Sequence, residues 1–385
     1  MKVFLIAGEP SGDKLGAALM AGVRTLAPDV VFDGVGGDAM AAMGLVSRFP
    51  MADLSVMGLA EVLPRLSLLR RRIRETATAI AGACPDVVIT IDSPDFCLRV
   101  LRLARAMRPD LPVVHYVAPS VWAWRPGRAA RMTPLVDHVL ALLPFEPPYM
   151  QAAGMTCDFV GHPVVTEARA TGAEIAELRA LVPGPAVLAL PGSRRGEIAR
   201  LAPRFGAALA QALPEGMTVL VPSVASQADL MRAQIAQWSV PALVLEDARA
   251  KRAAFAIADH ALAASGTVSL ELAANDTPMV IAYDVNPLSR LIAERMIRLD
   301  TVTLVNLVSE TRAVPECLGR ACTVPNIAQA LRRLVEDDDA RAAQRAAMAI
   351  TLDRLGQGGE APGLRAARSV MAFLAARQDR TRTGG

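Results

Sequence analysis

The chain of 385 residues has few aromatic side chains and almost no net charge. Only 4% of its residues are Phe, Trp or Tyr, and its formal net charge is +3. Proteins that bind single-stranded nucleic acid interleave aromatic and basic residues, and no such stretch occurs in this sequence. We therefore expect no nucleic-acid partner.

Cysteine is also scarce. The five cysteines are an odd number and contain no CxxC pair, which predicts neither a disulfide framework nor a zinc site. This pattern favours buried thiols in a reducing compartment. His115 and His162 lack a second histidine or a cysteine at ligand spacing, so we expect no metal and interpret both as buried histidines.

Long hydrophobic runs are missing as well. The apolar run that opens the chain ends at Gly8, Glu9 and Pro10, which makes it too short for a signal peptide or a membrane span. We expect a cytoplasmic protein. The length and the hydrophobic fraction of 52% predict two well-buried domains.

Apolar strands alternate with helical patterns such as 14–26 and 98–107, and several strands are continuous apolar runs. This pattern is typical of a doubly wound parallel sheet covered on both faces. It restarts after 161–185, which we interpret as the linker and the first helix of the second domain. We therefore expect two α/β domains of this class, with ligands at the carboxyl ends of the strands. The expected strands are 3–7, 30–35, 87–91, 113–117, 139–142 and 159–160, then 187–190, 218–221, 243–245, 261–264 and 279–282.

Two loops of the second domain have the composition of phosphate sites. Gly192, Ser193 and Arg194 follow an apolar strand and precede a helix, where free backbone amides and arginine favour an anion. The alternative is that Arg194 and Arg195 only solvate a helix start. The second loop is Ser265, Gly266 and Thr267, with Glu271 one helical turn later as a partner for a ribose diol.

In the first domain, the loop 7–13 (AGEPSGD) has two glycines, a hydroxyl and two carboxylates ahead of a helix. We predict that it contacts substrate through Glu9, Ser11, Gly12 and Asp13, and the alternative is a helix N-cap by Ser11 or Asp13. The segment 34–38 resembles a dinucleotide loop only loosely, because no complete GxGxxG is present.

Asp92 ends an apolar strand, and Asp95 follows in the turn. A partly desolvated carboxylate at that edge can accept a proton from an attacking hydroxyl, and the alternative role for Asp92 is to cap the next helix. The stretch 115–125 adds two tryptophans and an arginine to this aromatic-poor chain. These tryptophans either stack on a sugar or line an acyl pocket, or they pack the core.

The segment 58–75 contains Pro64 and then an amphipathic pattern with five arginines. We predict a helix that starts or kinks at Pro64 and carries Leu68 on the face opposite its apolar stripe. A leucine exposed among arginines indicates reversible docking on an anionic membrane surface, and the alternative is a solvated helix face. The residues assigned to docking are Leu66, Leu68, Leu69, Arg70, Arg71 and Arg72.

Motifs in both halves together resemble the lipid-A-disaccharide synthase family, which makes lipopolysaccharide in Gram-negative bacteria. They are AGEPSGD at 7–13, GVGGDAM at 34–40, VMGLAEVLPRL at 56–66, IDSPDF at 91–96, HYVAPSVWAWR at 115–125, LPFE at 143–146, GHP at 161–163, LPGSRRGEI at 190–198 and ASGTVSLE at 264–271. The resemblance implies a GT-B fold of two facing Rossmann-like domains with a crevice between them, and no metal or cofactor.

The implied reaction is an inverting transfer of 2,3-diacylglucosamine from its UDP derivative onto 2,3-diacylglucosamine 1-phosphate. Asp92 matches the family's proposed general base, and Ser193 with Arg194 matches its UDP loop. Asn306 matches its donor-site asparagine, although TVTLVN at 301–306 departs from the family's YVSLPN. Family members act at the inner face of the inner membrane, and a homodimer is expected.

The implied domains are 1–165 for the acceptor and membrane docking, 166–340 for the UDP-sugar, and 341–385 as C-terminal helices. These helices are expected to pack back on the first domain or to be exchanged in a dimer. Two other hypotheses are a UDP-N-acetylglucosamine epimerase of the same fold, against which the leucine and arginine pattern argues, and a nucleotide-sugar-binding regulator without catalysis.

Overall fold

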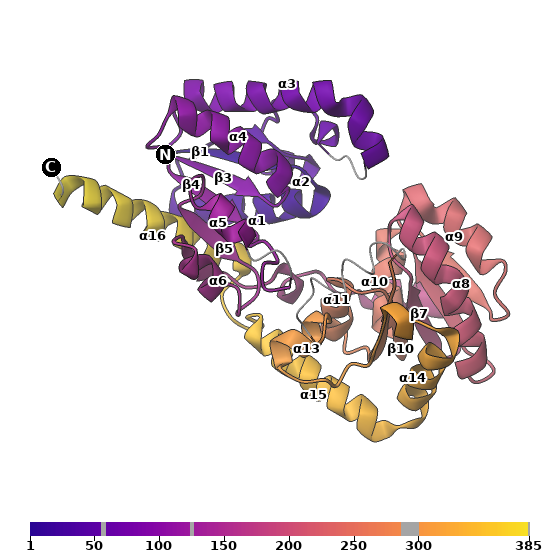
Figure 1. Ribbon diagram of the computed structural model, residues 1–385. Helices are drawn as coiled ribbons and strands as arrows, with labels where there is room; N and C mark the ends of the chain where they lie inside the picture. Colours follow the sequence, from indigo (N-terminus) through magenta and orange to yellow (C-terminus); the bar gives the residue numbers. More distant parts are fainter. Residues whose placement is uncertain (55–58, 124–126, 286–299, 384–385) are drawn as a thin grey trace. The chain divides into compact units, whose positions relative to one another are not determined.

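A computed structural model describes residues 1–54, 59–123, 127–285 and 300–383 (Figure 1). The chain forms two compact units. Unit 1 comprises Met1–Thr166 and Gly358–Gly385, and unit 2 comprises Glu167–Gln357. Unit 1 is therefore built from two separate segments of the chain.

Unit 1 contains a six-stranded parallel sheet in the order β2-β1-β3-β4-β5-β6. All five residues of β3 and all four of β4 are buried, as expected for strands that are covered on both faces. The strands are β1 (Lys2–Ala7), β2 (Val31–Val35), β3 (Val87–Ile91), β4 (Val113–Tyr116), β5 (His138–Ala141) and β6 (Thr156–Phe159).

Helices cover both faces of this sheet (Figure 1). One face packs against α3 (Leu59–Ala83), α4 (Pro94–Met107), α5 (Gly127–Met132) and α6 (Pro147–Ala152), and the other against α1 (Pro10–Leu26), α2 (Asp38–Ala42) and α16 (Pro362–Thr383). The 3-10 helices are η1 (Met51–Asp53) and η2 (Pro163–Val165). Helix α3 runs through Pro64 and so does not start there.

Unit 2 has a second six-stranded parallel sheet, in the order β12-β11-β10-β7-β8-β9. Its strands are β7 (Ala186–Leu190), β8 (Thr218–Pro222), β9 (Ala242–Leu245), β10 (His260–Ala263), β11 (Met279–Tyr283) and β12 (Glu316–Leu318). The edge strand β12 was not predicted, because three residues without alternation carry no strand signal.

Helices α8 (Arg195–Ala212), α9 (Ala228–Ile235) and α14 (Val324–Glu336) pack on one face of this sheet. Helices α10 (Ala248–Ile257) and α11 (Val268–Ala274) contact its strands as well, and they in turn contact α7 (Gly172–Leu181) and α15 (Asp338–Arg354) respectively. The remaining elements are α13 (Leu304–Ser309), η3 (Ala225–Gln227) and η4 (Gly319–Ala321).

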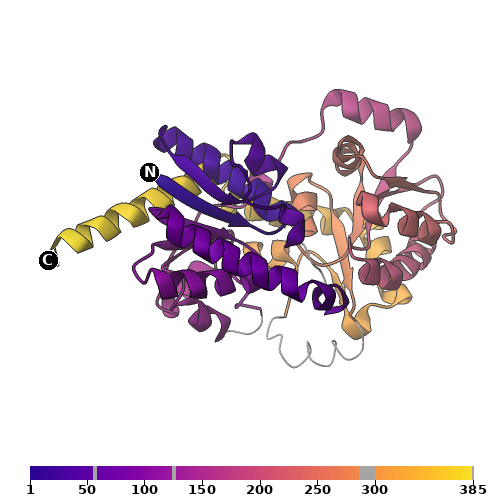
Figure 2. The same ribbon diagram turned by 90° about the horizontal axis from the view of Figure 1, so that it is seen from above.

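The C-terminal residues divide between the two units. Helix α15 packs in unit 2 against α11, α13 and α14, whereas α16 lies along α1 in unit 1. A partly buried hydrogen-bond network joins α16 to the sheet, since Ser369 Oγ lies 2.8 Å from His138 Nε2 and donates to Asp158 at 2.6 Å. The far end of α16 extends beyond the body of unit 1 (Figures 1 and 2).

Four of the five cysteines are buried, as predicted, but Cys84 is exposed at the end of α3. His115 and His162 are buried and hydrogen-bonded, the first to Thr90 Oγ1 and the second to the amide of Val164. Burial lowers the pKa of both imidazoles to about 4. Among the helices in the described ranges, none combines the length and the apolar composition needed to cross a membrane.

Candidate functional site

Two loops of unit 2 lie at the carboxyl ends of the neighbouring strands β7 and β10. The first turns at Gly192, whose φ is +105°, and a side chain there would strike the carboxylate of Glu197. Glu197 accepts a bond from the Arg194 amide at 3.4 Å and pairs with the Arg194 guanidinium at 3.1 Å. The carboxylate of Glu197 thus caps the amide that precedes α8 and holds the loop in place.

The two loops border one cavity of about 450 Å³. Its lining residues are Leu190, Gly192, Ser193, Arg194, Glu197, Pro222, Ser223, Val224, Lys251, Phe255, Ala264, Ser265, Gly266, Thr267, Val268 and Glu271. All six donor-site residues predicted from the two loops are among them. The cavity combines the start of α8, an arginine and two hydroxyl-bearing loops, which is a suitable environment for a diphosphate.

Sequence reasoning missed part of this cavity. Lys251 and Phe255 come from α10, Pro222 is the last residue of β8, and Ser223 and Val224 follow it. Neither stretch contains a glycine or a recognisable motif. The one available signal was position, because 222–224 also follow a predicted strand and belong to the same edge of the sheet.

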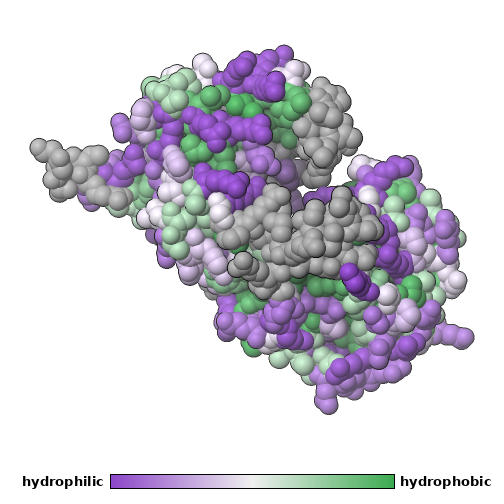
Figure 3. Space-filling view, in the orientation of Figure 1, coloured by the Kyte–Doolittle hydropathy of each residue, from purple (hydrophilic) through white to green (hydrophobic). Residues whose placement is uncertain are grey.

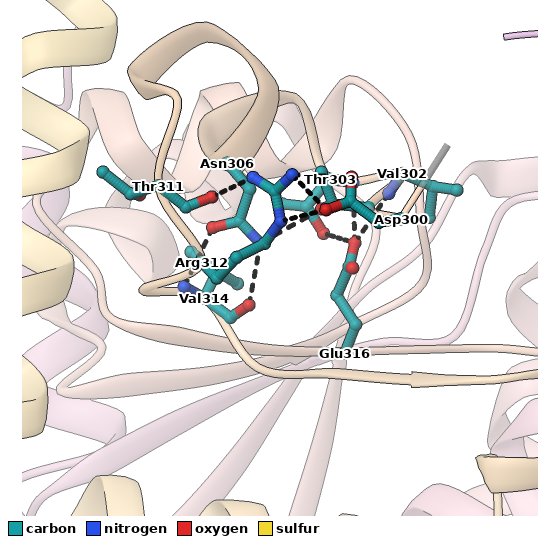
Figure 4. Close-up of polar contacts among 9 residues, drawn as sticks. Asp300, Val302, Thr303, Asn306, Thr311, Arg312, Val314 and Glu316 are labelled. Carbon is teal, nitrogen blue, oxygen red and sulfur yellow. Dashed lines mark hydrogen bonds and ion pairs between the residues drawn. The ribbon is translucent and has the colours of Figure 1, made fainter. Parts of the chain in front are cut away.

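Asn306 does not line this cavity, and the structure instead shows it buried in α13 (Figure 4). Its amide nitrogen donates to Thr301 Oγ1 at 3.2 Å and to the Val314 carbonyl at 2.9 Å, and its oxygen accepts from the Val314 amide at 3.0 Å. Close by, Glu316 accepts from the Val302 and Thr303 amides. Asn306 thus ties the segments on both sides of α13 together.

In unit 1, Asp92 follows the last residue of β3 in a strained turn. Asp92 and Ser93 have φ of 51° and 43°, and Val117, at the end of the adjacent β4, has φ of 84°. Left-handed conformations of such residues are costly and concentrate at functional sites. The Asp92 amide donates to the Tyr116 carbonyl at 2.9 Å, which fixes the turn to β4.

The carboxylate of Asp92 is half-buried and has no hydrogen bond to any residue that the structure describes. Helix α4 begins at Pro94 with Ser93 as N-cap, and no side chain caps it. The alternative role of Asp92 as a helix cap therefore has no support in the geometry. Its lone pairs are available to a hydroxyl donor.

The predicted substrate loop 7–13 meets the Asp92 turn, since a Cβ on Gly8 would lie only 2.6 Å from Ser93 Oγ. Pro10 begins α1, and neither Ser11 nor Asp13 caps it. Asp13 instead is buried and accepts bonds from the amides of Gly37, Ala39 and Met40. It anchors the 34–40 segment and α2, and this leaves Ser11 as an exposed hydroxyl of the loop.

At the ends of β4 and β5, Trp122 and Phe145 pack edge to face with centroids 5.1 Å apart. The indole of Trp122 donates to the buried carboxylate of Glu146 at 3.2 Å. Trp122 is half-buried and so contributes to the packing of this loop. Trp124 and Arg125 lie outside the described residues.

The docking residues assigned to α3 behave differently from one another. Arg70 and Arg71 are exposed, but Arg72 pairs with Asp53 at 2.7 Å and stacks on Phe49. Leu68 is half-buried, which corrects the expectation of an exposed leucine. Hydrophilic and hydrophobic side chains lie side by side over this helix (Figure 3), and the beginning of segment 58–75 falls partly outside the described residues.

A family model described as lipid-A-disaccharide synthetase matches residues 3–361. The lipid-A-disaccharide synthase of Ruegeria pomeroyi is 64% identical over 384 residues, with 96% of this chain and 95% of the relative covered. That of Rhodospirillum centenum is 46% identical over 389 residues, with 99% and 97% covered.

Solved structures share the fold. A UDP-GlcNAc 2-epimerase from Neisseria meningitidis bound to UDP-GlcNAc aligns with a TM-score of 0.64 over 98% of this chain and 100% of that chain, at 12% identity. A calicheamicin glycosyltransferase aligns with a TM-score of 0.55 over 97% and 98%, at 18% identity. The two units with parallel sheets are those of the GT-B fold, as predicted.

Proposed function

Because the chain belongs to the lipid-A-disaccharide synthase family, whose members are UDP-sugar glycosyltransferases, we propose that it transfers 2,3-diacylglucosamine from UDP-2,3-diacylglucosamine to 2,3-diacylglucosamine 1-phosphate. The product is a β-1,6-linked disaccharide 1-phosphate, and UDP is released. The full-length match at 64% identity carries this proposal. The epimerase alternative has only a likeness of fold at 12% identity in its favour.

In this proposal the cavity of unit 2 holds the UDP part of the donor. When the bond between the anomeric carbon and the phosphate oxygen breaks, negative charge builds up on the leaving UDP. Arg194, the backbone amides of its loop and the hydroxyls of Ser265 and Thr267 would stabilise that charge. Fixed donors of this kind need no reorganisation during the reaction.

Asp92 of unit 1 acts as the general base. Its carboxylate takes the proton of the acceptor's 6-hydroxyl while that oxygen attacks the anomeric carbon from the side opposite UDP. One displacement of this kind inverts the configuration. The half-buried carboxylate with uncommitted lone pairs, at a strained strand end, supports this role.

Unit 1 also meets the acceptor and the membrane in this proposal. Both substrates are acylated, and α3 presents Arg70 and Arg71 to solvent, where they attract an anionic lipid surface. The enzyme would act as a peripheral protein on the inner face of the inner membrane. We further propose a homodimer.

The test is UDP release from UDP-2,3-diacylglucosamine in detergent micelles, with and without the acceptor. Asp92→Asn keeps the size of the side chain and removes the base, so we expect kcat to fall by about 10²-fold or more. Asp95→Asn is the matched control, because Asp95 lies three residues away and its side chain is 97% exposed. We expect this control to retain full activity.

Release of UDP without acceptor, or turnover of UDP-N-acetylglucosamine alone, would favour the epimerase over the transferase. Full activity of Asp92→Asn would remove the base from the mechanism and leave the transferase reaction standing. Binding of UDP-sugar without any turnover would support the non-catalytic regulator.

A further inference from the structure

An ion pair joins two helices at the edge of the unit 2 cavity. Lys251 Nζ of α10 lies 2.7 Å from Glu271 Oε2 of α11, and both side chains line the cavity. The ammonium also lies 5.3 Å from the centre of the Phe255 ring, one helical turn further along α10. Lys251 is therefore held from two sides, by a carboxylate and by an aromatic face.

The charge of Glu271 poses a problem for a cavity that receives a nucleoside diphosphate. An unpaired carboxylate would repel the phosphates, and this repulsion is weakly screened in a partly enclosed site. The Lys251 ammonium cancels that charge locally. It also limits the rotamers of the Glu271 side chain, which is only 29% exposed.

The pairing leaves hydrogen-bonding capacity on Glu271. Its Oε1 atom has no hydrogen bond or ion pair to another residue in the described ranges, and a carboxylate can accept from two neighbouring hydroxyls. In Rossmann-like domains an acidic side chain commonly accepts hydrogen bonds from the ribose of a bound nucleotide. In the proposed function, the phosphates bind the Arg194 loop and the Ser265–Thr267 loop, which both line the cavity.

We propose that Lys251 is a positioning residue, which holds Glu271 in the orientation that accepts the ribose hydroxyls of the bound uridine diphosphate. This inference rests on the proposed function, in which the cavity binds UDP. Lys251 acts through Glu271 and does not itself contact the nucleotide. It extends the donor site to α10, which neither glycine loop includes.

The test is isothermal titration of the full-length protein with UDP and with 2′,3′-dideoxy-UDP, which lacks both ribose hydroxyls. The variant Lys251→Met keeps a long apolar side chain at this position and removes the ammonium charge. We expect UDP to bind about tenfold more weakly to this variant, because Glu271 is no longer held where it accepts the hydrogen bonds of the ribose hydroxyls. The dideoxy nucleotide, already weaker with the wild type, should bind equally to both proteins.

Two further variants sharpen the comparison. Lys251→Arg retains the cation and should restore most of the preference for UDP over the dideoxy nucleotide. Arg249→Met is the matched control, because Arg249 lies on α10 outside the cavity, where it pairs with Glu174 and Glu177. This control should bind UDP as the wild type does.

An equal loss of affinity for both nucleotides in Lys251→Met would overturn the proposal, because it would mean that the lysine contacts the phosphates or only supports the fold. Unchanged affinity for both would overturn it as well. Failure of the wild type to bind either nucleotide would instead overturn the donor site of the proposed function, and the role of Lys251 with it.

Discussion

At the scale of single residues, Glu146 is an unusual carboxylate because it is buried and no cation lies beside it among the residues that the structure describes. Its oxygens accept from the Leu143 amide at 3.0 Å and from the Trp122 indole at 3.2 Å, and only 4% of the residue is exposed. Desolvation raises its pKa from the ordinary 4.5 to about 7, against the opposing effect of these two hydrogen bonds.

This shift predicts a pH-dependent stability. The folded protein holds a proton on Glu146 at pH values where the unfolded chain has lost it, so the free energy of unfolding falls as the pH rises from about 4.5 through about 7. Urea unfolding of the wild type should show this fall, of about 1–3 kcal/mol, and Glu146→Gln should lack it. Glu215→Gln, at an exposed position, is the control and should follow the wild type. Parallel pH profiles for wild type and Glu146→Gln would contradict the prediction.

Residue identity alone predicted some roles and missed others. Asp92 was identified because an acid at the end of an apolar strand is a recognisable signal. The left-handed turn around it was not predicted, since neither Asp92 nor Ser93 is a glycine, the residue that adopts positive φ without steric cost. The buried roles of Asp13 and Asn306 were also missed. Both depend on amides from segments that only the tertiary fold brings within reach.

At the scale of elements, the arginines of α3 differ in the residues that they contact. Arg70 and Arg71 are exposed, and Arg71 forms a 3.5 Å ion pair with Glu75 on its own helix. Arg72 binds Asp53 and Glu75 and stacks on Phe49, which ties α3 to the segment before it. The first two are therefore the better candidates for lipid contact, and the third for stability.

We expect the double variant Arg70→Gln, Arg71→Gln to bind phosphatidylglycerol vesicles more weakly by about 2 kcal/mol, as measured by co-sedimentation. The reason is that each arginine near an anionic surface contributes about 1 kcal/mol of binding free energy. Thermal stability should remain unchanged. The matched control Arg72→Gln should keep vesicle binding and lose about 1–2 kcal/mol of stability. Docking through α3 would be refuted by a double variant that sediments like the wild type.

Periodicity predicted most of the elements, because long apolar strands and amphipathic helices carry strong signals. All eleven strands expected in the two sheets are present with boundaries shifted by a few residues, and β12 is the addition. The parts that could not be predicted depend on contacts between distant segments. Lys251 and Phe255 reach the cavity in this way, because α10 packs against β7 and β8 of the sheet.

At the scale of the whole molecule, unit 1 depends on a helix that follows unit 2 in the chain. Helix α16 buries Ala366, Ala367 and Val370 against α1, and Ser369 completes the network with His138 and Asp158. Without α16, one face of the unit 1 core and a histidine would be exposed. Unit 2 contains no residue of α16.

Deletion of residues 358–385 should therefore destabilise unit 1 and leave unit 2 folded. Hydrogen exchange followed by mass spectrometry should show lost protection in α1, β5 and β6, with protection of β7 and α8 retained. A shorter deletion of residues 380–385 is the control, and it should exchange as the wild type does. Equal loss of protection in both units would mean that they unfold as one.

The place of α16 in the chain also sets an order of biosynthesis. The ribosome makes all of unit 2 between β6 and α16, which takes on the order of ten seconds or more at the usual rates of translation. During that interval the faces of α1 and β5 that α16 will cover stay open in the nascent chain. Unit 2 can fold as soon as it emerges, so unit 1, whose synthesis starts before that of unit 2, is completed after it.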